Sequence, residues 1–548
     1  MNYQLSKKEI KFIISLSLFL IVLTCLPFIY GYASQGDFVY TGLHKLVPVD
    51  GALYFSYLEQ IRQGNWLLDI LYTNETDYLQ FFNLFWLVVG LVGKILHLNP
   101  ALTFHLFRII LLPFFIYIVY KFIKLILPNL ELRLKKVFLL YIIFSAGFGG
   151  YWSLIFPDKE FSPLNFDFPI DLFVPEANNF LILFYSPHFI LSLSLIICIF
   201  YYFLRAIWEK KIIYSILAGV VGLFLFNFHP FYFITIYSIP LVYLVVICVS
   251  KRKIIWQYFL YYILLVSISL PSVSYYLYFL LTNENFQIKS AQNNSLSPLA
   301  SYFFLSYGLN LILAILCQVY LIERKKVNKR IIFLFVWFWF GIVLIYGPFN
   351  FQRRLTEGWQ IPLATLACLC LLIIWLYIKR QKIEIKKAYL YFLTGFFVVM
   401  LCFTNILFLY KDIKYLQRKS CYVYLTKDFS QALAWYKQQT NFSQTLLCSI
   451  QNSNIIPGQI ARRVFLGHAV ETINFNEKVT KLDWFFSNNQ DDQQKIEFLK
   501  QAKIDYVLYT ALEKKLGDYD PLAKEYLKLV YENDKVQIFQ VNLIQPGQ

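Results

Sequence analysis

The amino-acid sequence predicts an all-α polytopic membrane bundle of about 11–13 transmembrane helices, followed by a small C-terminal soluble α/β domain. Three observations lead to this prediction. The 548 residues are 58% hydrophobic and only 15% charged, whereas about a quarter of the residues in a soluble domain are charged. Apolar runs long enough to cross about 30 Å of hydrocarbon recur between residues 12 and 410. After residue 410 the composition becomes polar and no such run follows.

Basic residues predict the orientation of the bundle. The formal net charge of +17 is concentrated between the apolar runs. Short basic loops of this kind mark the cytoplasmic side and contact anionic lipid, so the charge does not indicate a nucleic-acid partner. The first basic cluster places the loop that follows the first run outside the cell. The basic segments are 7–11, 121–136, 205–211, 251–253, 324–330 and 379–387.

One of these basic segments conflicts with the others. If all twelve apolar runs cross the membrane, segment 121–136 lies outside. The four later basic loops agree with one another, so we predict that one early run is not a simple crossing. The best candidate is 81–98, which would be re-entrant or interfacial.

The chain therefore divides into two predicted domains. Residues 1–410 form a multi-pass membrane domain with a first external loop at 31–78, and residues 411–548 form an extracytoplasmic domain. In the second domain, short β-like runs alternate with helical runs, which predicts a small α/β sandwich. The β-like runs are 445–449, 464–467, 506–509 and 536–541, and the helical runs are 429–438 and 493–502.

The stretch 49–66 in the first external loop predicts a short amphipathic helix on a membrane surface. Asp50 opens this helix, and two interpretations of it stay open. Asp50 is an N-cap whose carboxylate accepts the first free amides, or it faces a cavity and removes a proton from an acceptor hydroxyl. The apolar face holds Leu53, Tyr54, Tyr57, Leu58 and Ile61, and the polar face holds Ser56, Glu59, Gln60 and Gln63.

Two adjacent arginines, Arg353 and Arg354, lie between two runs on the predicted outer side, against the charge bias of the chain. Arginine binds phosphate with a planar fork of donors, which suits a lipid phosphate or diphosphate at the membrane edge. An ordinary pair that reaches lipid headgroups, with Glu357 as its ion partner, explains them equally well. Both interpretations stay open.

His188 and His229 each adjoin a proline at a predicted outer helix end. An interrupted helix at membrane depth is tolerated chiefly where it lines a cavity. These histidines are therefore candidates for substrate contact, with a purely structural role as the alternative.

Several functional classes are disfavoured by missing motifs. The sequence has no glycine-rich nucleotide loop, no zinc-protease motif and no nucleophile elbow, which argues against a nucleotide-driven pump, a metalloprotease and a serine hydrolase. The nine cysteines show no metal-ligand spacing. We predict no cofactor; a divalent metal has no specific acidic motif in this chain.

The arrangement resembles the GT-C superfamily of membrane glycosyltransferases. The resemblance rests on an Asp-bearing first external loop with a membrane-parallel helix, about a dozen spans and an extracytoplasmic tail domain. The tail resembles those of bacterial relatives of the type that uses polyprenyl-phosphate sugars. The motifs are Asp50-x-x-x-Tyr54, Ser186-Pro187-His188, His229-Pro230, Arg353-Arg354-x-x-Glu357-Gly358 and Gly467-His468-Ala469-Val470-Glu471-Thr472.

The resemblance implies an inverting transfer of a sugar from a polyprenyl-phosphate or diphosphate donor to a glycan, lipid or protein acceptor at the outer membrane face. By analogy, Asp50 would be the general base, and Arg353 and Arg354 would hold the leaving phosphate. The residues that would contact substrate are Tyr54, Glu59, His188, His229 and Glu357.

The sequence departs from the GT-C pattern at one position that bears on whether the protein needs a metal. Many GT-C enzymes carry paired acids in the first external loop, but Gly51 follows Asp50 here. A second acid would have to come from Glu59 or from another loop.

Two other functions stay open. A transporter or flippase of lipid-linked glycans needs polar residues deep in the spans, and a run such as 331–346 has few. A non-catalytic membrane assembly protein that displays the tail domain would not need Asp50. For the enzyme, we expect Asp50 and Arg353 to face one cavity at the membrane edge.

Overall fold

The structure is a computed structural model that describes residues 4–75, 80–157, 167–382, 386–488 and 491–542. The chain divides into two compact units. Unit 1 comprises Met1–Cys25, Phe107–Leu277 and Asn294–Lys411, and unit 2 comprises Leu26–Leu106, Tyr278–Asn293 and Asp412–Gln548. Four helices contribute residues to both units: α1 (Lys7–Ala33), α4 (Pro100–Ile126), α11 (Trp256–Thr282) and α16 (Lys387–Gln417).

Unit 1 is built from apolar helices. A backbone in hydrocarbon must satisfy its own hydrogen bonds, so the long apolar runs form helices. Besides the shared helices, unit 1 contains α5 (Leu132–Phe144), α6 (Gly149–Ile155), α7 (Asn179–Tyr185), α8 (Pro187–Glu209), α9 (Ile212–Phe228), α10 (Phe233–Lys251), α13 (Ala300–Glu323), α14 (Lys329–Ile345) and α15 (Gln360–Arg380). Its short 3₁₀ helices are η1 (Ile170–Leu172), η2 (Pro175–Ala177), η3 (Pro230–Tyr232) and η4 (Gln352–Thr356).

Nine helices of the described chain are long and apolar enough to cross a membrane. The predicted bundle is confirmed, with a lower count because α9 and α14 have 17 residues each. Such helices rise about 26 Å, close to the lower limit for a crossing.

The predicted non-crossing run agrees with the structure. Helix α3 (Leu84–Ile95) has only 12 residues and rises about 18 Å. The basic ends of several unit 1 helices also meet. The Glu9 carboxylate near the start of α1 lies 3.3 Å from the Lys124 ammonium near the end of α4. The basic segment after α4 is therefore at the same end of unit 1 as the basic N-terminus, which removes the conflict in the charge pattern.

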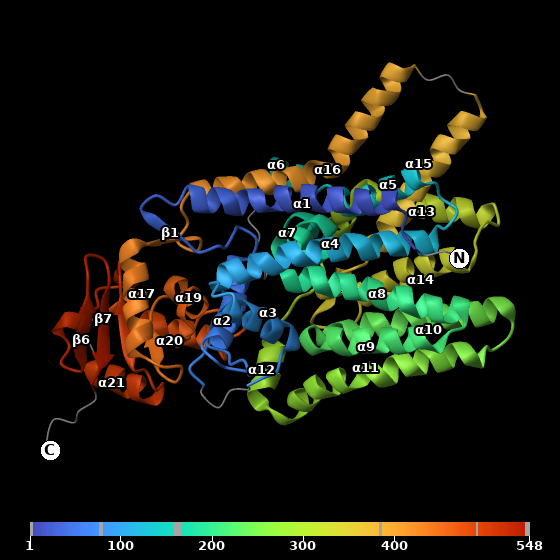
Figure 1. The fold of residues 1–548 in the computed structure, drawn as a ribbon. Coiled ribbons are helices and arrows are strands. Elements are labelled where there is room, and N and C mark those ends of the chain that lie inside the picture. The colour runs from blue at the N-terminus through green and yellow to red at the C-terminus, as the bar shows by residue number, and fades with distance from the viewer. Residues whose placement is uncertain (1–3, 76–79, 158–166, 383–385, 489–490, 543–548) are drawn as a thin grey trace. The chain divides into compact units, whose positions relative to one another are not determined.

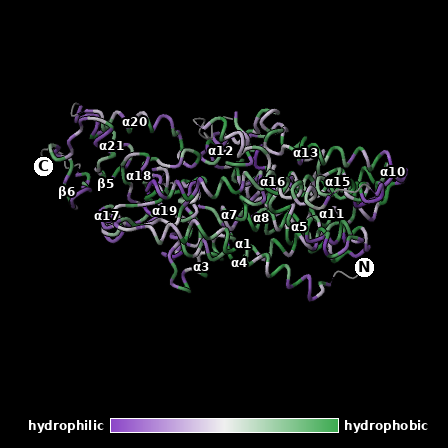
Figure 2. Tube along the Cα trace, turned by 90° about the horizontal axis from the view of Figure 1, so that it is seen from above, coloured by the Kyte–Doolittle hydropathy of each residue, from purple (hydrophilic) through white to green (hydrophobic). Residues whose placement is uncertain are grey.

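The later basic loops of unit 1, which follow α8 and precede α14, also lie close to one another. The Trp208 indole at the end of α8 donates a hydrogen bond to the Tyr243 hydroxyl of α10 (3.1 Å). The Lys329 ammonium at the start of α14 lies 5.4 Å from the Trp208 ring centroid. Figure 1 shows α8, α9 and α10 side by side, and α8 packs against both of the other helices. Figure 2 shows hydrophobic colour predominating along α5, α8 and α15, and more hydrophilic colour around α20, α21 and β6.

Unit 2 contains a five-stranded mixed sheet with the strand order β4-β3-β5-β7-β6. Strand β3 is parallel to β4 and β5, and β7 is antiparallel to β5 and β6. The predicted β-like runs correspond to β3, β4, β5 and β7, so the predicted α/β character of the C-terminal residues is confirmed. The strands are β3 (Thr445–Leu447), β4 (Arg463–Val464), β5 (Tyr506–Tyr509), β6 (Leu527–Glu532) and β7 (Gln537–Val541).

Helices cover this sheet, and a second small sheet joins distant parts of the chain. Buried apolar side chains of the strands, such as Val507 and Phe539, pack with Phe485 and Leu499 of the helices. Strand β1 (Phe38–Tyr40) pairs antiparallel with β2 (Tyr424–Thr426). The remaining elements are α12 (Glu284–Gln292), α17 (Lys427–Gln439), α18 (Ile450–Ser453), α19 (Ile456–Ile460), α20 (Phe475–Ser487), α21 (Asp492–Gln501), η5 (Glu513–Lys515) and η6 (Pro521–Ala523).

Helix α2 (Pro48–Arg62) forms where the amphipathic helix is predicted, but protein encloses its polar face. Ser56, Glu59 and Gln60 are each at most 1% exposed. Helix α19 packs directly on α2: a Cβ atom on Gly458 would lie 2.5 Å from the Ala52 carbonyl oxygen. The predicted helix is therefore confirmed, the expectation that its polar face meets water is corrected, and its position on a membrane surface stays a prediction.

Candidate functional site

Asp50 is the third residue of α2 and is not its N-cap. Val47 occupies the N-cap position, with a left-handed backbone (φ 46°) and no side-chain cap bond. The N-cap interpretation of Asp50 is therefore wrong, although a carboxylate in the first turn still interacts favourably with the helix dipole. A β-branched residue in the left-handed region is strained by about 1–2 kcal/mol.

Asp50 has a hydrogen-bond partner in His468, which lies between β4 and α20. The His468 Nε2 atom lies 2.8 Å from Oδ1 of Asp50. On the other side of the ring, Nδ1 accepts a hydrogen bond from the Val470 amide (3.2 Å). In the neutral ring the proton is therefore on Nε2, which donates to Asp50. The Asp50 side chain is 35% exposed and that of His468 only 10%, so Asp50 is held by a buried group and stays accessible.

Charges around His468 shift its titration. Burial lowers the pKa of His468, but the hydrogen bond and the negative charge of Asp50 outweigh burial, so the pKa lies above its ordinary value. Glu471 acts in the same direction and Lys289 opposes it. Glu471 forms an ion pair with Lys289 of α12. Of the two carboxylates near His468, Asp50 is therefore the one that is hydrogen-bonded to its imidazole.

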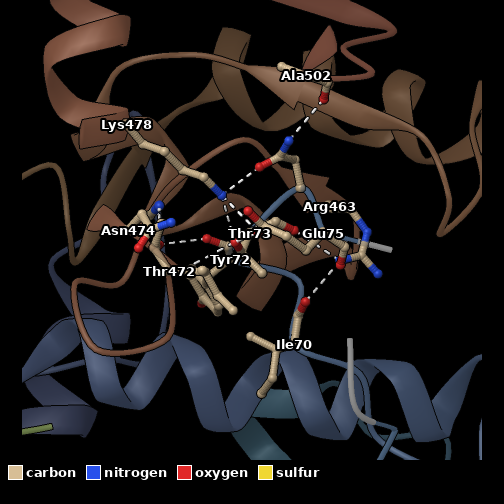
Figure 3. Close-up of polar contacts among 12 residues, drawn as sticks. Ile70, Tyr72, Thr73, Glu75, Arg463, Thr472, Asn474, Lys478 and Ala502 are labelled. Carbon is tan, nitrogen blue, oxygen red and sulfur yellow. Dashed lines mark hydrogen bonds and ion pairs between the residues drawn. The ribbon is translucent and has the colours of Figure 1, made fainter. Parts of the chain in front are cut away.

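Two buried cations bind the loop after α2 to the C-terminal residues (Figure 3). The Lys478 ammonium donates to the Thr73 hydroxyl (2.8 Å) and pairs with Glu75 (2.8 Å). The Arg463 guanidinium lies 2.5 Å from the Asp69 carboxylate. These contacts fix residues 69–75 along the edge of β4.

Two further predicted residues of α2 have protein partners. Glu59 is fully buried and pairs with Arg62 (2.7 Å) and Lys437 (2.5 Å). Burial raises the pKa of Glu59, but the hydrogen bonds from these groups outweigh burial, so its pKa lies below the ordinary value. The Tyr54 ring stacks on Trp86 with centroids 5.1 Å apart. The ion pairs explain Glu59 without a substrate, and the substrate roles of both residues stay predictions.

Unit 1 brings the two predicted histidines together at broken helix ends. Pro187 begins α8 and Pro230 begins η3, which sets where these helices start. The rings of His188 and His229 stack with centroids 5.0 Å apart, and both residues are 4% exposed. His188 Nδ1 contacts the Ser186 hydroxyl (2.5 Å). Neither ring nitrogen of His229 has a hydrogen-bond partner among the described residues.

An unpaired buried imidazole is costly. Leaving a buried polar group without a partner costs about 1–3 kcal/mol, and such groups in native proteins call for an explanation such as a bound ligand. His229 therefore marks this end of α9 as a place where a polar ligand would be stabilising.

The segment that carries Arg353 and Arg354 adjoins the same end of unit 1. Both arginines belong to η4, and the Arg354 guanidinium lies 5.2 Å from the ring centroid of Phe231, which follows Pro230. The buried Glu357 carboxylate accepts hydrogen bonds from Ser192 of α8 and Tyr232 of η3. Glu357 thus ties the arginine segment to the two helix ends that hold the histidines.

Four of the predicted site residues lie together in the structure, whereas one hydrogen-bond partner of Asp50 was not predicted. His188, His229, Arg354 and Glu357 gather at one end of unit 1, opposite the basic ends of its helices. Asp50 belongs to unit 2 and Arg353 to unit 1, and their expected shared cavity stays a prediction. His468 was not predicted as a site residue, although its motif Gly467–Thr472 was visible in the tail.

Among the described residues, those that surround Asp50 do not make up a set of metal ligands. Within the described parts of the chain, no three His, Cys, Asp or Glu side chains lie together in a way that could hold a metal ion. Oδ1 of Asp50 faces the Nε2–H of His468, and a ring nitrogen that carries a proton is a hydrogen-bond donor and not a metal ligand. We therefore derive no step through a metal.

Comparisons with known proteins find similarity in fold alone. No protein-family model matches the sequence, and a search of curated proteins finds no match. The oligosaccharyltransferase of Archaeoglobus fulgidus, solved with a tethered acceptor peptide containing the NVT sequon, has a TM-score of 0.54 and 13% identity, over 90% of this chain and 69% of that chain. The same enzyme was solved with an inhibitory peptide and a dolichol-phosphate (TM-score 0.53, 12% identity, 94% and 72% covered). A third structure of it, with zinc and sulfate, has a TM-score of 0.53 and 12% identity, with 96% and 73% covered.

Proposed function

We propose that this chain, which has the fold of the GT-C membrane glycosyltransferases, transfers a sugar from a polyprenyl-phosphate-linked donor to a glycan, lipid or protein acceptor. The observation that carries the proposal is the buried His188–His229 pair beside Arg354. A phosphorylated ligand would satisfy both the His229 imidazole, which has no hydrogen-bond partner among the described residues, and the Arg354 guanidinium close to it.

The donor phosphate is assigned to the arginine segment. When the bond between the sugar and the phosphate breaks, negative charge develops on the leaving oxygen. Fixed cations at that point stabilise the transition state more than the ground state, because the charge is largest there. Arg353 and Arg354 supply these cations, and His229 supplies an additional N–H donor. Glu357 positions Arg354 through its bonds to Ser192 and Tyr232.

The acceptor is activated by Asp50. The nucleophilic atom of the acceptor attacks the anomeric carbon, and the bond from that carbon to the phosphate oxygen breaks, with its electron pair leaving on the phosphate. The acceptor proton passes to the Asp50 carboxylate, which later releases it to water. Attack from the face opposite the phosphate inverts the anomeric configuration.

The reaction is placed at the outer face of the cell membrane. The basic helix ends of unit 1 meet at one end, which the positive-inside rule makes cytoplasmic. We infer that α9 and α14 cross together with the nine long helices, and eleven crossings from a cytoplasmic N-terminus leave residues 412–548 outside. The histidine pair lies at helix ends opposite the basic ones, so it also belongs to the outer side.

The test is a transfer assay with the purified full chain in lipid nanodiscs. Radiolabelled polyprenyl-phosphate sugars serve as donors, because the A. fulgidus enzyme was solved with a dolichol-phosphate. An NVT-containing peptide and extracted membrane lipids serve as acceptors, because that enzyme was also solved with such a peptide. We expect a new glycosidic product with at least one acceptor class.

A matched pair of arginine variants locates the donor site. Arg354→Gln is expected to raise KM for the donor, and Arg324→Gln at an exposed basic helix end is expected to leave it unchanged. Movement of the labelled lipid across the bilayer without a new glycosidic bond would contradict the proposal, and so would equal KM values for the two variants.

A further inference from the structure

We propose that His468 is a positioning residue for Asp50: it donates a hydrogen bond that holds the carboxylate in one orientation, and it does not relay the proton. This inference rests on the proposed function, because it assigns His468 a role towards the proposed general base. His468 would act in the reaction only through Asp50.

The contact is suited to positioning. The Nε2–Oδ1 distance of 2.8 Å is that of a strong charge-assisted hydrogen bond. Because the Asp50 side chain is 35% exposed, a substrate can reach the carboxylate while His468 holds it. A carboxylate that is fixed in one orientation loses less entropy when it meets the acceptor.

The His468 ring itself is fixed from several directions. The Val470 amide donates to Nδ1 (3.2 Å), and the Tyr72 ring packs edge-on at a centroid distance of 6.0 Å. The backbone turns tightly here, since the Thr472 amide donates to the His468 carbonyl (2.9 Å). The Thr472 hydroxyl in turn donates to the Tyr72 carbonyl (2.7 Å). The first external loop and the C-terminal segment thus hold the imidazole together.

The occupied Nδ1 atom argues against a proton relay. A relay requires Nε2 to accept a proton from Asp50 while Nδ1 gives one up. Here Nδ1 already accepts a backbone N–H, so in the neutral ring it has no proton to give up. The neutral ring therefore donates from Nε2, and the protonated ring donates from the same atom. The bond to Asp50 persists through both states.

The other carboxylate near His468, Glu471, has a cationic partner of its own, so His468 acts on Asp50. Glu471, three residues further along the chain, is paired with Lys289 of α12. The Gln292 side chain at the end of α12 donates to the Thr472 carbonyl (2.9 Å). Tyr72 is fully buried and carries no charge near neutral pH. Among the described residues, the titratable groups that face His468 are Asp50, Glu471, Lys289 and Tyr72.

The first experiment is a pH–rate profile of sugar transfer by the full chain. In His468→Ala the donor is lost, so we expect kcat to fall about 10- to 100-fold and the acidic limb of the profile to move to higher pH. KM for the donor should not change. His468→Gln retains an N–H donor and should recover part of the rate. His97→Gln, at an exposed histidine of the same unit, is the control. An unmoved acidic limb in His468→Ala would overturn the assignment, whatever happens to kcat.

The second experiment does not depend on activity. Melting temperatures are compared for wild type, Asp50→Asn, His468→Gln and the double variant in nanodiscs. If the two side chains interact, the second substitution costs little once the first is present, so the two shifts are not additive. Additive shifts would overturn the proposal. Coupled shifts without any sugar transfer by wild type would instead contradict the proposed function and leave the pair intact.

Discussion

Replacing Lys478 by methionine would release the loop after α2 from the C-terminal residues. The Lys478 ammonium is 8% exposed and bonds to Thr73 (2.8 Å), Asn74 (2.5 Å) and Glu75 (2.8 Å), as Figure 3 shows in part. Methionine has a similar length and no charge, so all three acceptors lose this donor. A hydrogen bond to a charged group is worth about 1.5–3 kcal/mol, and water screens the share of Glu75, which is 29% exposed. We therefore take the total loss as about 3 kcal/mol.

Hydrogen exchange of the loop measures this loss directly. About 3 kcal/mol corresponds to a roughly 100-fold increase in local opening, since about 1.4 kcal/mol is a factor of ten. Exchange is followed by mass spectrometry on peptides that cover residues 68–75 of the full chain. The control is Lys481→Met on the same helix, whose ammonium is 49% exposed and pairs with Glu477 at 2.7 Å. If the loop exchanges at the same rate in both variants, the conclusion that the Lys478 ammonium holds the loop against the C-terminal residues is refuted.

Three other substitutions or conditions test the structure of unit 2 by melting temperature. Val47→Gly removes the left-handed strain at the start of α2 (φ 46°) and should stabilise the protein by about 1 kcal/mol; a lower melting temperature would contradict this. Gly458→Ala places a methyl group 2.5 Å from the Ala52 carbonyl oxygen and should destabilise by about 1–3 kcal/mol; unchanged melting would show that α19 does not rest on α2. Because the pKa of His468 is raised, its stabilising contribution is complete below about pH 6.5 and is lost as pH rises through the folded value. Asp50→Asn should abolish this pH dependence, and a wild-type-like dependence in that variant would argue against the pair.

The membrane topology was largely predictable because it depends on composition and charge. Apolar runs and basic loops are local features, and they indicated both the bundle and the non-crossing run that forms α3. The strands β3, β4, β5 and β7 were also indicated by short apolar runs. Strand β6 was missed: it lies at the edge of the sheet, and its Lys528 and Glu532 are exposed, which weakens its apolar pattern.

The contacts of the candidate site were less predictable because they join distant parts of the chain. Helical periodicity shows which residues of α2 share a face, but not what covers that face. Its cover includes Gly458 and Lys437, which lie hundreds of residues further along the chain. Likewise, His468 is 418 residues from Asp50. No spacing rule connects them, although the tail motif was visible.

The histidine pair is an intermediate case. The prolines beside His188 and His229 showed that both residues stand at interrupted helix ends on one predicted side. The sequence could not show that the two rings stack 5.0 Å apart, or that His229 lacks a hydrogen-bond partner among the described residues. Those facts depend on how α8 and α9 pack.

The most direct measurement compares sugar transfer by Asp50→Asn with transfer by Asp37→Asn. Asp37 is a 97% exposed carboxylate of the same unit, paired with Lys427 at 3.2 Å, so the same change of charge is made at a site without proposed chemistry. With both variants inserted and resistant to proteolysis like wild type, we expect Asp50→Asn to lower kcat at least about 100-fold and Asp37→Asn to transfer sugar at the wild-type rate. Wild-type transfer by Asp50→Asn would contradict the central claim that this carboxylate activates the acceptor.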